Sequence, residues 1–162
     1  MNRILVFFAV VFLVSFQVGG QPTLDLSGDW RFMPDPENVG VDKGWFAPDF
    51  SDEQWKILQG GTRWEEQGFT DLDGYAWYRK WISVPSEWTG KQIWLVLGAV
   101  NDNYVLYCNG RKVNTFGDET DRSIAEIATA ADLTSFVKCG ERNMIAIRVF
   151  DWGGNGGLWR KP

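Results

Sequence analysis

The sequence predicts an all-β protein built as a β-sandwich or jelly roll, with one or two short helical turns. Several short segments are rich in aromatic and β-branched residues and are separated by turn signals. The pair Asn109-Gly110 lies between two such segments and indicates a tight hairpin. Helix signals are few and short, so packed sheets have to bury the core.

The first expected strand is residues 26–32 (LSGDWRF), where Trp30 and Phe32 share one face and would be core anchors. Residues 74–85 (GYAWYRKWISVP) carry aromatic side chains on both faces, which predicts a strand covered on both sides. In residues 143–150 (NMIAIRVF), side chains alternate between two faces with Ile145, Ile147 and Val149 on one of them, which predicts a strand. The remaining expected strands are residues 91–98 and 103–113.

Two segments favour short helical turns. Ser51–Gln54 matches the capping-box pattern, although Gly60-Gly61 limits any extension. Residues 123–137 contain a helical turn or two around IAEIATAADL and LTSFV.

Residues 1–20 are expected to be a secretory signal peptide. Arg3 provides a positive start, residues 4–16 form an apolar core, and small residues lead to a cleavage site after Gly20. A retained N-terminal membrane anchor is the alternative, disfavoured by the short apolar stretch. The mature chain, residues 21–162, is then one secreted or periplasmic domain with no membrane segment after cleavage.

Composition excludes several functions. With 15 basic and 21 acidic residues after removal of Arg3, the mature net charge is −6, which does not suit nucleic acid or an anionic membrane. The chain has no histidine, which excludes Ser-His-Asp, Cys-His and HExxH chemistry. We expect no zinc site, no metal-binding site residues and no cofactor, while the sequence leaves open a structural Ca²⁺ of the kind that some jelly-roll modules bind. An exported protein permits a disulfide between Cys108 and Cys139, which spacing alone does not decide.

The order of the motifs resembles a known family. LSGDWRF, FAPDFSDEQWKIL, WEEQGFTDLDGYAWYRKWISVP, LVLGAVNDNYVLYCNGRKV, DLTSFVKCGERNMIAIRVFD and GGLWRKP follow one another over nearly the whole mature chain. This series is similar to the N-terminal sugar-binding domain of family 2 glycoside hydrolases, the β-galactosidase and β-glucuronidase group. Similar modules accompany some sialate O-acetylesterases. The resemblance implies a galactose-binding-like jelly roll.

The resemblance implies no catalytic residues in this chain. In the family, both catalytic glutamates lie on a TIM barrel downstream, and such a barrel alone needs about 250 residues. Seven acidic side chains are therefore expected to be solvated loop charges: Glu65, Glu66, Asp71, Asp73, Asp118, Glu119 and Asp121.

Carbohydrate binding is the expected function, with an aromatic and polar tail loop as the candidate site. The resemblance places an aspartate at the end of the last strand near sugar, and the matching position is Asp151. Trp152, Asn155 and Trp159 complete the candidate site. Tryptophans within strands (Trp30, Trp77, Trp81 and Trp94) are expected in the core, whereas those in loops or at strand ends (Trp45, Trp64, Trp88, Trp152 and Trp159) are better candidates for sugar contact.

Two partners remain open at this stage. One is a carbohydrate, a β-galactoside or similar glycan, bound by an accessory domain. The other is the downstream domains of a glycosidase, in which case the chain is a structural fragment of a truncated or split hydrolase or O-acetylesterase without sugar binding. An independent enzyme is the least favoured reading.

Overall fold

The computed structural model describes residues 22–117 and 127–159, and it confirms an all-β sandwich. The predicted signal peptide, residues 1–20, lies outside the described residues. No helix in the described ranges is long and apolar enough to cross a membrane. The two short 3-10 turns are η1 (Glu65–Gln67) and η2 (Ser86–Trp88).

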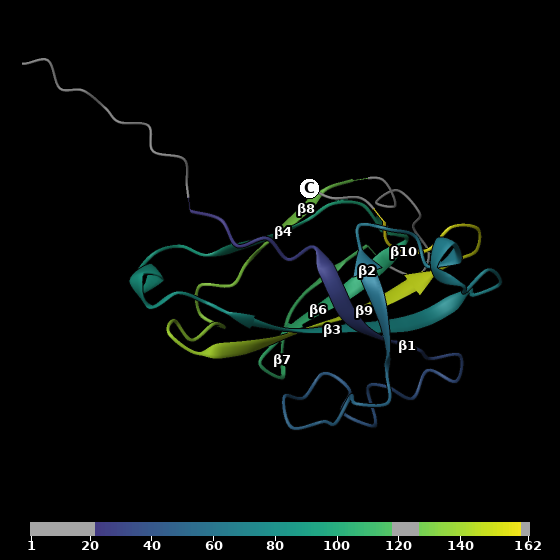
Figure 1. The fold of residues 1–162 in the computed structure, drawn as a ribbon, viewed down its shortest axis with the longest axis horizontal. Helices are drawn as coiled ribbons and strands as arrows, with labels where there is room; N and C mark the ends of the chain where they lie inside the picture. The colour runs from purple at the N-terminus through teal and green to yellow at the C-terminus, as the bar shows by residue number, and fades with distance from the viewer. Residues whose placement is uncertain (1–21, 118–126, 160–162) are drawn as a thin grey trace, which may run out of the picture.

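The strands form one large sheet covered by two small ones. The large sheet has the order β2-β1-β3-β9-β6-β7, and the small sheets are β4-β8 and β5-β10. The large sheet contains β1 (Gly28–Pro34), β2 (Lys56–Gly60), β3 (Gly74–Ser83), β6 (Asn103–Cys108), β7 (Arg111–Phe116) and β9 (Arg142–Asp151). The small sheets contain β4 (Trp94–Leu97), β5 (Val100–Asn101), β8 (Thr129–Asp132) and β10 (Gly157–Leu158). In Figure 1, β4 and β8 lie on one side of the large sheet and the blue loop of residues 35–55 on the other.

The centre of the large sheet is the antiparallel pair β3 and β9. Its register runs without interruption from Gly74 opposite Asp151 to Ser83 opposite Arg142. The inner face of this pair joins the main core, in which Trp30 and Phe32 are 2% and 0% exposed. The outer face packs against a second cluster of aromatic side chains. The prediction that residues 74–85 are covered on both faces is therefore confirmed.

The hairpin predicted at Asn109-Gly110 is present between β6 and β7. Both residues have positive φ, 51° and 78°, as the two central residues of a type I′ turn require. The Asn109 side chain also donates a hydrogen bond to Asn143 Oδ1 (2.7 Å) and accepts one from the Met144 amide (2.9 Å). Asn109 thus fixes the turn and ties it to the start of β9.

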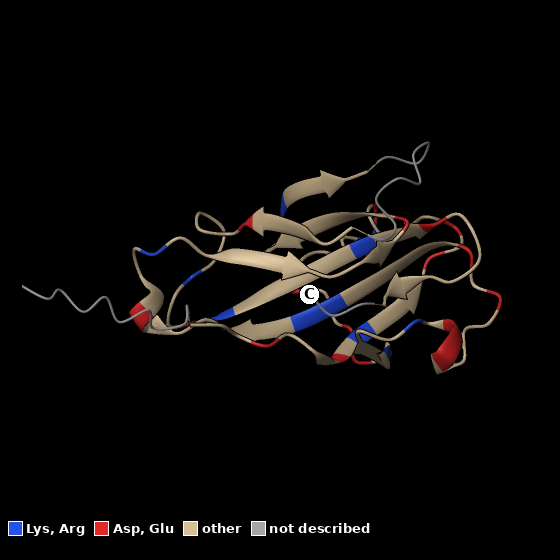
Figure 2. Ribbon diagram, turned by 90° about the horizontal axis from the view of Figure 1, so that it is seen from above, with Lys and Arg blue, Asp and Glu red and all other residues tan. Residues whose placement is uncertain are grey.

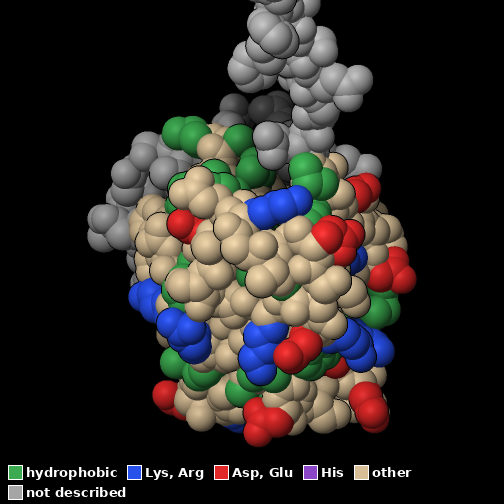
Figure 3. Space-filling model, turned by 90° about the vertical axis from the view of Figure 1, so that its left-hand side faces the viewer, with side chains coloured by type: hydrophobic (Ala, Val, Ile, Leu, Met, Phe, Trp, Pro, Cys, Tyr) green, Lys and Arg blue, Asp and Glu red, His purple; other side chains and the backbone are tan. Residues whose placement is uncertain are grey.

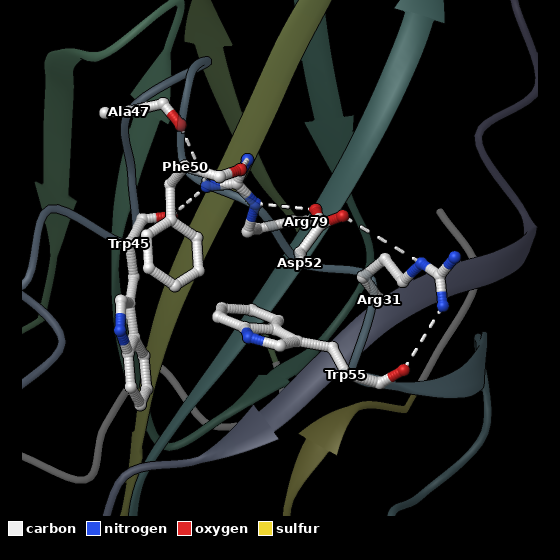
Figure 4. A network of polar contacts seen from close by, with 7 residues as sticks. All are labelled: Arg31, Trp45, Ala47, Phe50, Asp52, Trp55 and Arg79. Atoms are coloured by element: carbon white, nitrogen blue, oxygen red, sulfur yellow. Dashed lines mark hydrogen bonds and ion pairs between the residues drawn. The ribbon is translucent and has the colours of Figure 1, made fainter.

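A buried arginine holds the loop of residues 35–55 on the outer face (Figure 4). The Arg79 side chain is fully buried, and its Nε donates to Asp52 Oδ2 at 2.8 Å. Its other nitrogens donate to the backbone carbonyls of Trp45, Ala47 and Phe50. Each nitrogen of the guanidinium has a hydrogen-bond acceptor, so the buried charge of Arg79 is compensated.

The capping-box prediction at Ser51–Gln54 is wrong, because these residues form a turn. Asp52 binds Arg79 through its side chain and the amide of Trp55 through its backbone carbonyl (3.0 Å). Strand β2 then begins at Lys56, which leaves no room for a helix after the turn, and the Asp52 side chain is used in the contact with Arg79 and not as a helix cap.

The helical reading of residues 123–137 is only partly correct. Residues 123–126 lie outside the described residues, and Thr129–Asp132 forms strand β8 beside β4. Ala131 is 5% exposed and lies opposite Leu95, so this segment alternates between core and solvent. A single helical turn follows, in which the Val137 amide donates to Leu133 O at 3.1 Å.

Two of the four strand tryptophans are not core residues. Trp30 and Trp77 are buried as expected, but Trp81 is 39% and Trp94 is 55% exposed. Trp81 lies under the Arg142 guanidinium, 4.9 Å from its ring centre. Trp94 lies on the outward side of β4, whose residues alternate between exposed and buried.

Cys108 and Cys139 are free thiols in the structure, so the disulfide left open by the sequence is not formed there. Cys108 is fully buried on β6, whereas Cys139 is half-buried and packs against the edge of the same core. Burial raises the pKa of the Cys108 thiol to about 11, which makes it a packing residue.

Candidate functional site

Unsatisfied polar groups gather where β9 ends. Buried polar atoms nearly always have hydrogen-bond partners in folded proteins, so a buried polar atom without a partner (an orphan polar group below) needs an explanation. In the described ranges, every buried side-chain atom without a partner belongs to this end of the molecule or to the nearby outer face of β9. They are Trp64 Nε1, Glu65 Oε2, Tyr78 OH, Arg148 Nε and both carboxyl oxygens of Asp151.

Asp151 is the centre of an acidic group on the inner face. Its side chain is 1% exposed, and burial raises its pKa to about 7. The backbone N–H of Gly153 offsets part of this rise, while Asp102, Asp73 and Glu65 add to it by charge repulsion. Figure 2 shows acidic segments around the end at which β9 stops. The pKa of Asp151 is therefore shifted toward neutral pH.

The acidic side chains also hold the loop that follows β9. Asp102 Oδ2 accepts a hydrogen bond from the Trp152 amide (2.8 Å), and Glu65 Oε1 accepts one from the Gly156 amide (2.9 Å). Backbone amides therefore satisfy only one oxygen of each carboxylate that they contact.

The opposite end of the sandwich, facing the viewer in Figure 3, shows acidic and basic side chains mixed together.

Two glycines allow this loop to lie close to the core. A Cβ atom on Gly156 would lie 1.9 Å from the Trp64 ring, and one on Gly157 would lie 2.6 Å from Tyr78 OH. Any side chain at these positions would clash, so glycine is needed for close approach. The loop then returns as β10, which pairs with β5 and buries Leu158.

The four predicted sugar-binding residues do not form one cluster. Asp151 faces the interior, while Trp152 is 39% exposed and packs edge-on against Phe150 on the outer side. Asn155 is exposed, and its backbone carbonyl accepts a hydrogen bond from Asn101. Trp159 is half-buried, with the Arg63 guanidinium 4.8 Å from its ring centre. Of the four, Trp152 and Asn155 are the exposed ones.

The other loop tryptophans considered for sugar contact differ in exposure. Trp45 and Trp64 are buried at 8% and 0%, so both are packing residues. Trp88 is half-buried in the turn η2. Of the loop tryptophans, Trp152 is therefore the most accessible.

Sequence reasoning missed the polar part of the outer face. Arg148 lies on β9 between Trp77 of β3 and Val105 of β6. Its orphan Nε is buried, and its guanidinium stacks on Tyr75 at 3.9 Å. An arginine in the middle of an otherwise apolar strand face was the signal that could have identified it.

The site offers buried carboxyl groups beside backbone amides and an exposed tryptophan. In the described residues, no group of three or more cysteine, aspartate and glutamate side chains is placed to hold a metal ion. Backbone amides of the tail loop cover the acidic group, in which Asp151 and Asp102 are 1% and 5% exposed.

Comparisons with known proteins agree with the fold. Residues 65–159 match the model of the sugar binding domain of glycosyl hydrolases family 2. A β-glucuronidase of Paenibacillus borealis is 26% identical over 133 residues, which cover 79% of this chain and 21% of the relative. The β-galactosidase BoGH2A of Bacteroides ovatus is 27% identical over 137 residues, which cover 77% of this chain and 15% of the relative.

The same relation is seen in three dimensions. A solved structure of Ruminococcus gnavus β-glucuronidase matches with a TM-score of 0.69 at 24% identity, over 78% of this chain and 20% of that chain. This likeness shows the fold. The chain spans about a fifth or less of the length of these relatives. Because the family model matches more than half of the sequence, the chain belongs to the sugar-binding domain family of the family 2 glycosyl hydrolases.

Proposed function

We propose that this protein is an exported, non-catalytic carbohydrate-binding or accessory domain of a family 2-type glycoside hydrolase. The observation that carries the proposal is the position of the family match. It runs from Glu65 to Trp159 and so includes η1, β3, β9 and the tail loop, which together form the end with orphan polar groups. A non-catalytic role is supported by the relatives' length, since most of each relative lies outside the matched part.

Trp152 is the side chain best placed to contact a sugar. It is 39% exposed at the start of the loop, where its ring can cover the C–H face of a pyranose. Asn155 lies at the exposed part of the same loop and offers an amide to sugar hydroxyls. Asp102 and Glu65 hold this loop in position through the backbone amides of Trp152 and Gly156.

Calorimetric or NMR titration of the purified chain with methyl β-galactoside and related glycans tests the proposal. Trp152→Ala and Asn155→Ala should weaken binding severalfold. Trp94→Ala is the matched control, because Trp94 is exposed on a different sheet. Absence of binding at tens of millimolar sugar, or equal weakening by Trp94→Ala, would speak against a sugar site at the tail loop.

A second candidate function is packing against other domains of a longer hydrolase. The outer side of β4 favours it, because Trp94 and Val96 are 55% and 48% exposed next to each other on that face. A groove of about 1070 Å³ with mainly apolar walls adjoins this strand. Exposed apolar surface of this kind is typical of an interface. Genomic sequence beyond the codon for Pro162 that encodes further hydrolase domains would support this function.

Export is tested separately. Expression of the full chain in a bacterium and N-terminal sequencing of the exported product should show a start near Gln21. A product that stays in the membrane with Met1 retained would support the anchor instead.

A further inference from the structure

A hollow of about 280 Å³ lies on the outer face of the large sheet, beside the tail loop. Arg148 and Phe150 of β9 form part of its wall, together with Tyr75 of β3. The ring of Phe150 contacts both Tyr75 (4.7 Å between centroids) and Trp152 (5.3 Å). Phe150 therefore separates the hollow from the exposed ring of Trp152 and contacts both.

Arg148 has no counter-ion in the described parts of the chain. The ion pairs found there are Arg31 and Arg79 with Asp52, and Lys138 with Glu141. Arg148 instead stacks on Tyr75 and donates one hydrogen bond from Nη2 to Asn38 Oδ1, and its buried Nε has no acceptor. Arg79, on the neighbouring strand, shows the contrasting case of a fully satisfied guanidinium.

Arg148 lines the hollow without a carboxylate partner among the described residues, and this indicates the chemical class of the ligand. A guanidinium presents a planar fork of donors, and its preferred acceptor is a carboxylate or phosphate. The aromatic walls favour a ligand with flat apolar C–H surface, which inorganic phosphate does not have. Ligand pockets usually measure about 300–1,000 Å³, so this hollow holds one ring and not a long oligosaccharide.

We propose that this hollow binds a carboxylate-bearing monosaccharide unit, with the carboxylate at the Arg148 guanidinium and the sugar ring against Phe150. This inference rests on the proposed carbohydrate function and deepens it by naming the charge of the ligand. The position next to Trp152 lets a neighbouring sugar unit continue onto the tail loop.

NMR titration of the ¹⁵N-labelled protein with sodium glucuronate tests the proposal, with glucose as the uncharged comparison. Glucuronate should shift the amides around Arg148 and the indole of Trp152, and it should bind about tenfold or more tightly than glucose. Arg148→Gln should weaken glucuronate binding roughly ten- to hundredfold, the usual effect of losing a charge-assisted hydrogen bond. Binding of glucose should change little.

Arg142→Gln is the matched control. Arg142 lies at the other end of β9 over Trp81, so this change removes the same charge outside the hollow. Thermal unfolding of each variant verifies the fold. If Arg148→Gln does not fold, Arg148→Lys keeps the charge without the planar fork, and it should still weaken glucuronate binding severalfold.

The outcomes separate this inference from the proposed function. Equal binding of glucose and glucuronate through Trp152 overturns the carboxylate site and leaves carbohydrate binding intact. Competition by acetate or inorganic phosphate at equal concentration means that Arg148 binds any anion, and it overturns the sugar ligand. Equal weakening by Arg142→Gln means that overall charge causes the preference, which also overturns the site. Absence of binding of every sugar refutes both proposals.

Discussion

Replacing Asp151 with asparagine is expected to stabilise the protein at about pH 8 and to change it much less near pH 4. Asp151 is 1% exposed, and burial raises its pKa from 3.8 to about 7. Above that pH its charge must be held in a buried position near the carboxylates of Glu65, Asp73 and Asp102, and the Gly153 N–H offsets only part of this cost. Asparagine has nearly the same shape and no charge.

The magnitude follows from proton linkage. Between about pH 4 and pH 7, the folded state holds a proton that the unfolded state has lost, so Asp151 makes stability fall as pH rises through this window. A pKa rise from 3.8 to about 7 corresponds to roughly 4 kcal/mol at most. The glycine-rich loop next to Asp151 can admit water, so we expect Asp151→Asn to gain about 1–4 kcal/mol at pH 8.

Urea unfolding followed by tryptophan fluorescence between about pH 4 and pH 8.5 measures the effect. The difference in unfolding free energy between Asp151→Asn and the parent should grow with pH and level off above about pH 7. Glu141→Gln is the control, because Glu141 is exposed and pairs with an exposed Lys138 at 3.8 Å. It should change stability by less than about 1 kcal/mol. A pH-independent difference for Asp151→Asn would refute the reasoning.

Three further predictions concern packing. Arg79→Met should lower the unfolding free energy by about 3–5 kcal/mol in urea, because it leaves Asp52 without its buried partner; a loss below about 1 kcal/mol would contradict the role of the network. Gly156→Ala should lower the melting temperature more than Gly154→Ala, whose Cβ has open space so that only the strain of its φ of 101° is added, and equal effects would argue against close packing at Gly156. A thiol reagent should label Cys139 in the folded protein and Cys108 only after unfolding, whereas no labelling in either state would indicate a disulfide.

The strands could be predicted because their signals are local. The alternation on β9 and the positive-φ pair at Asn109-Gly110 act within a few residues, and the structure retains both. The family resemblance, carried by the order of the motifs along the chain, added the jelly-roll architecture, which a single local pattern does not contain.

The wrong predictions of secondary structure and burial concern segments whose conformation depends on contacts with residues far away in the sequence. The capping-box pattern at Ser51–Gln54 is overridden because Asp52 binds Arg79, 27 residues away. Thr129–Asp132 is a strand because β4 offers an edge and Ala131 fills the core opposite Leu95. Trp94 is exposed because β4 belongs to a two-stranded sheet, and no rule based on residue type contains that information.

The candidate site was only partly predictable, for a reason that lies in the pleat of β9. Successive side chains of a strand point to opposite faces, so residues three apart never share a face. Arg148 and Asp151 are three apart: the first lies on the outer face with Tyr75, and the second is buried on the inner face near Glu65. Although their charges are opposite, they cannot neutralise one another. Among the described residues, this end of the strand therefore carries an arginine without a carboxylate partner on one face and a buried carboxyl group of raised pKa on the other, so neither residue indicates the presence of the other in the sequence.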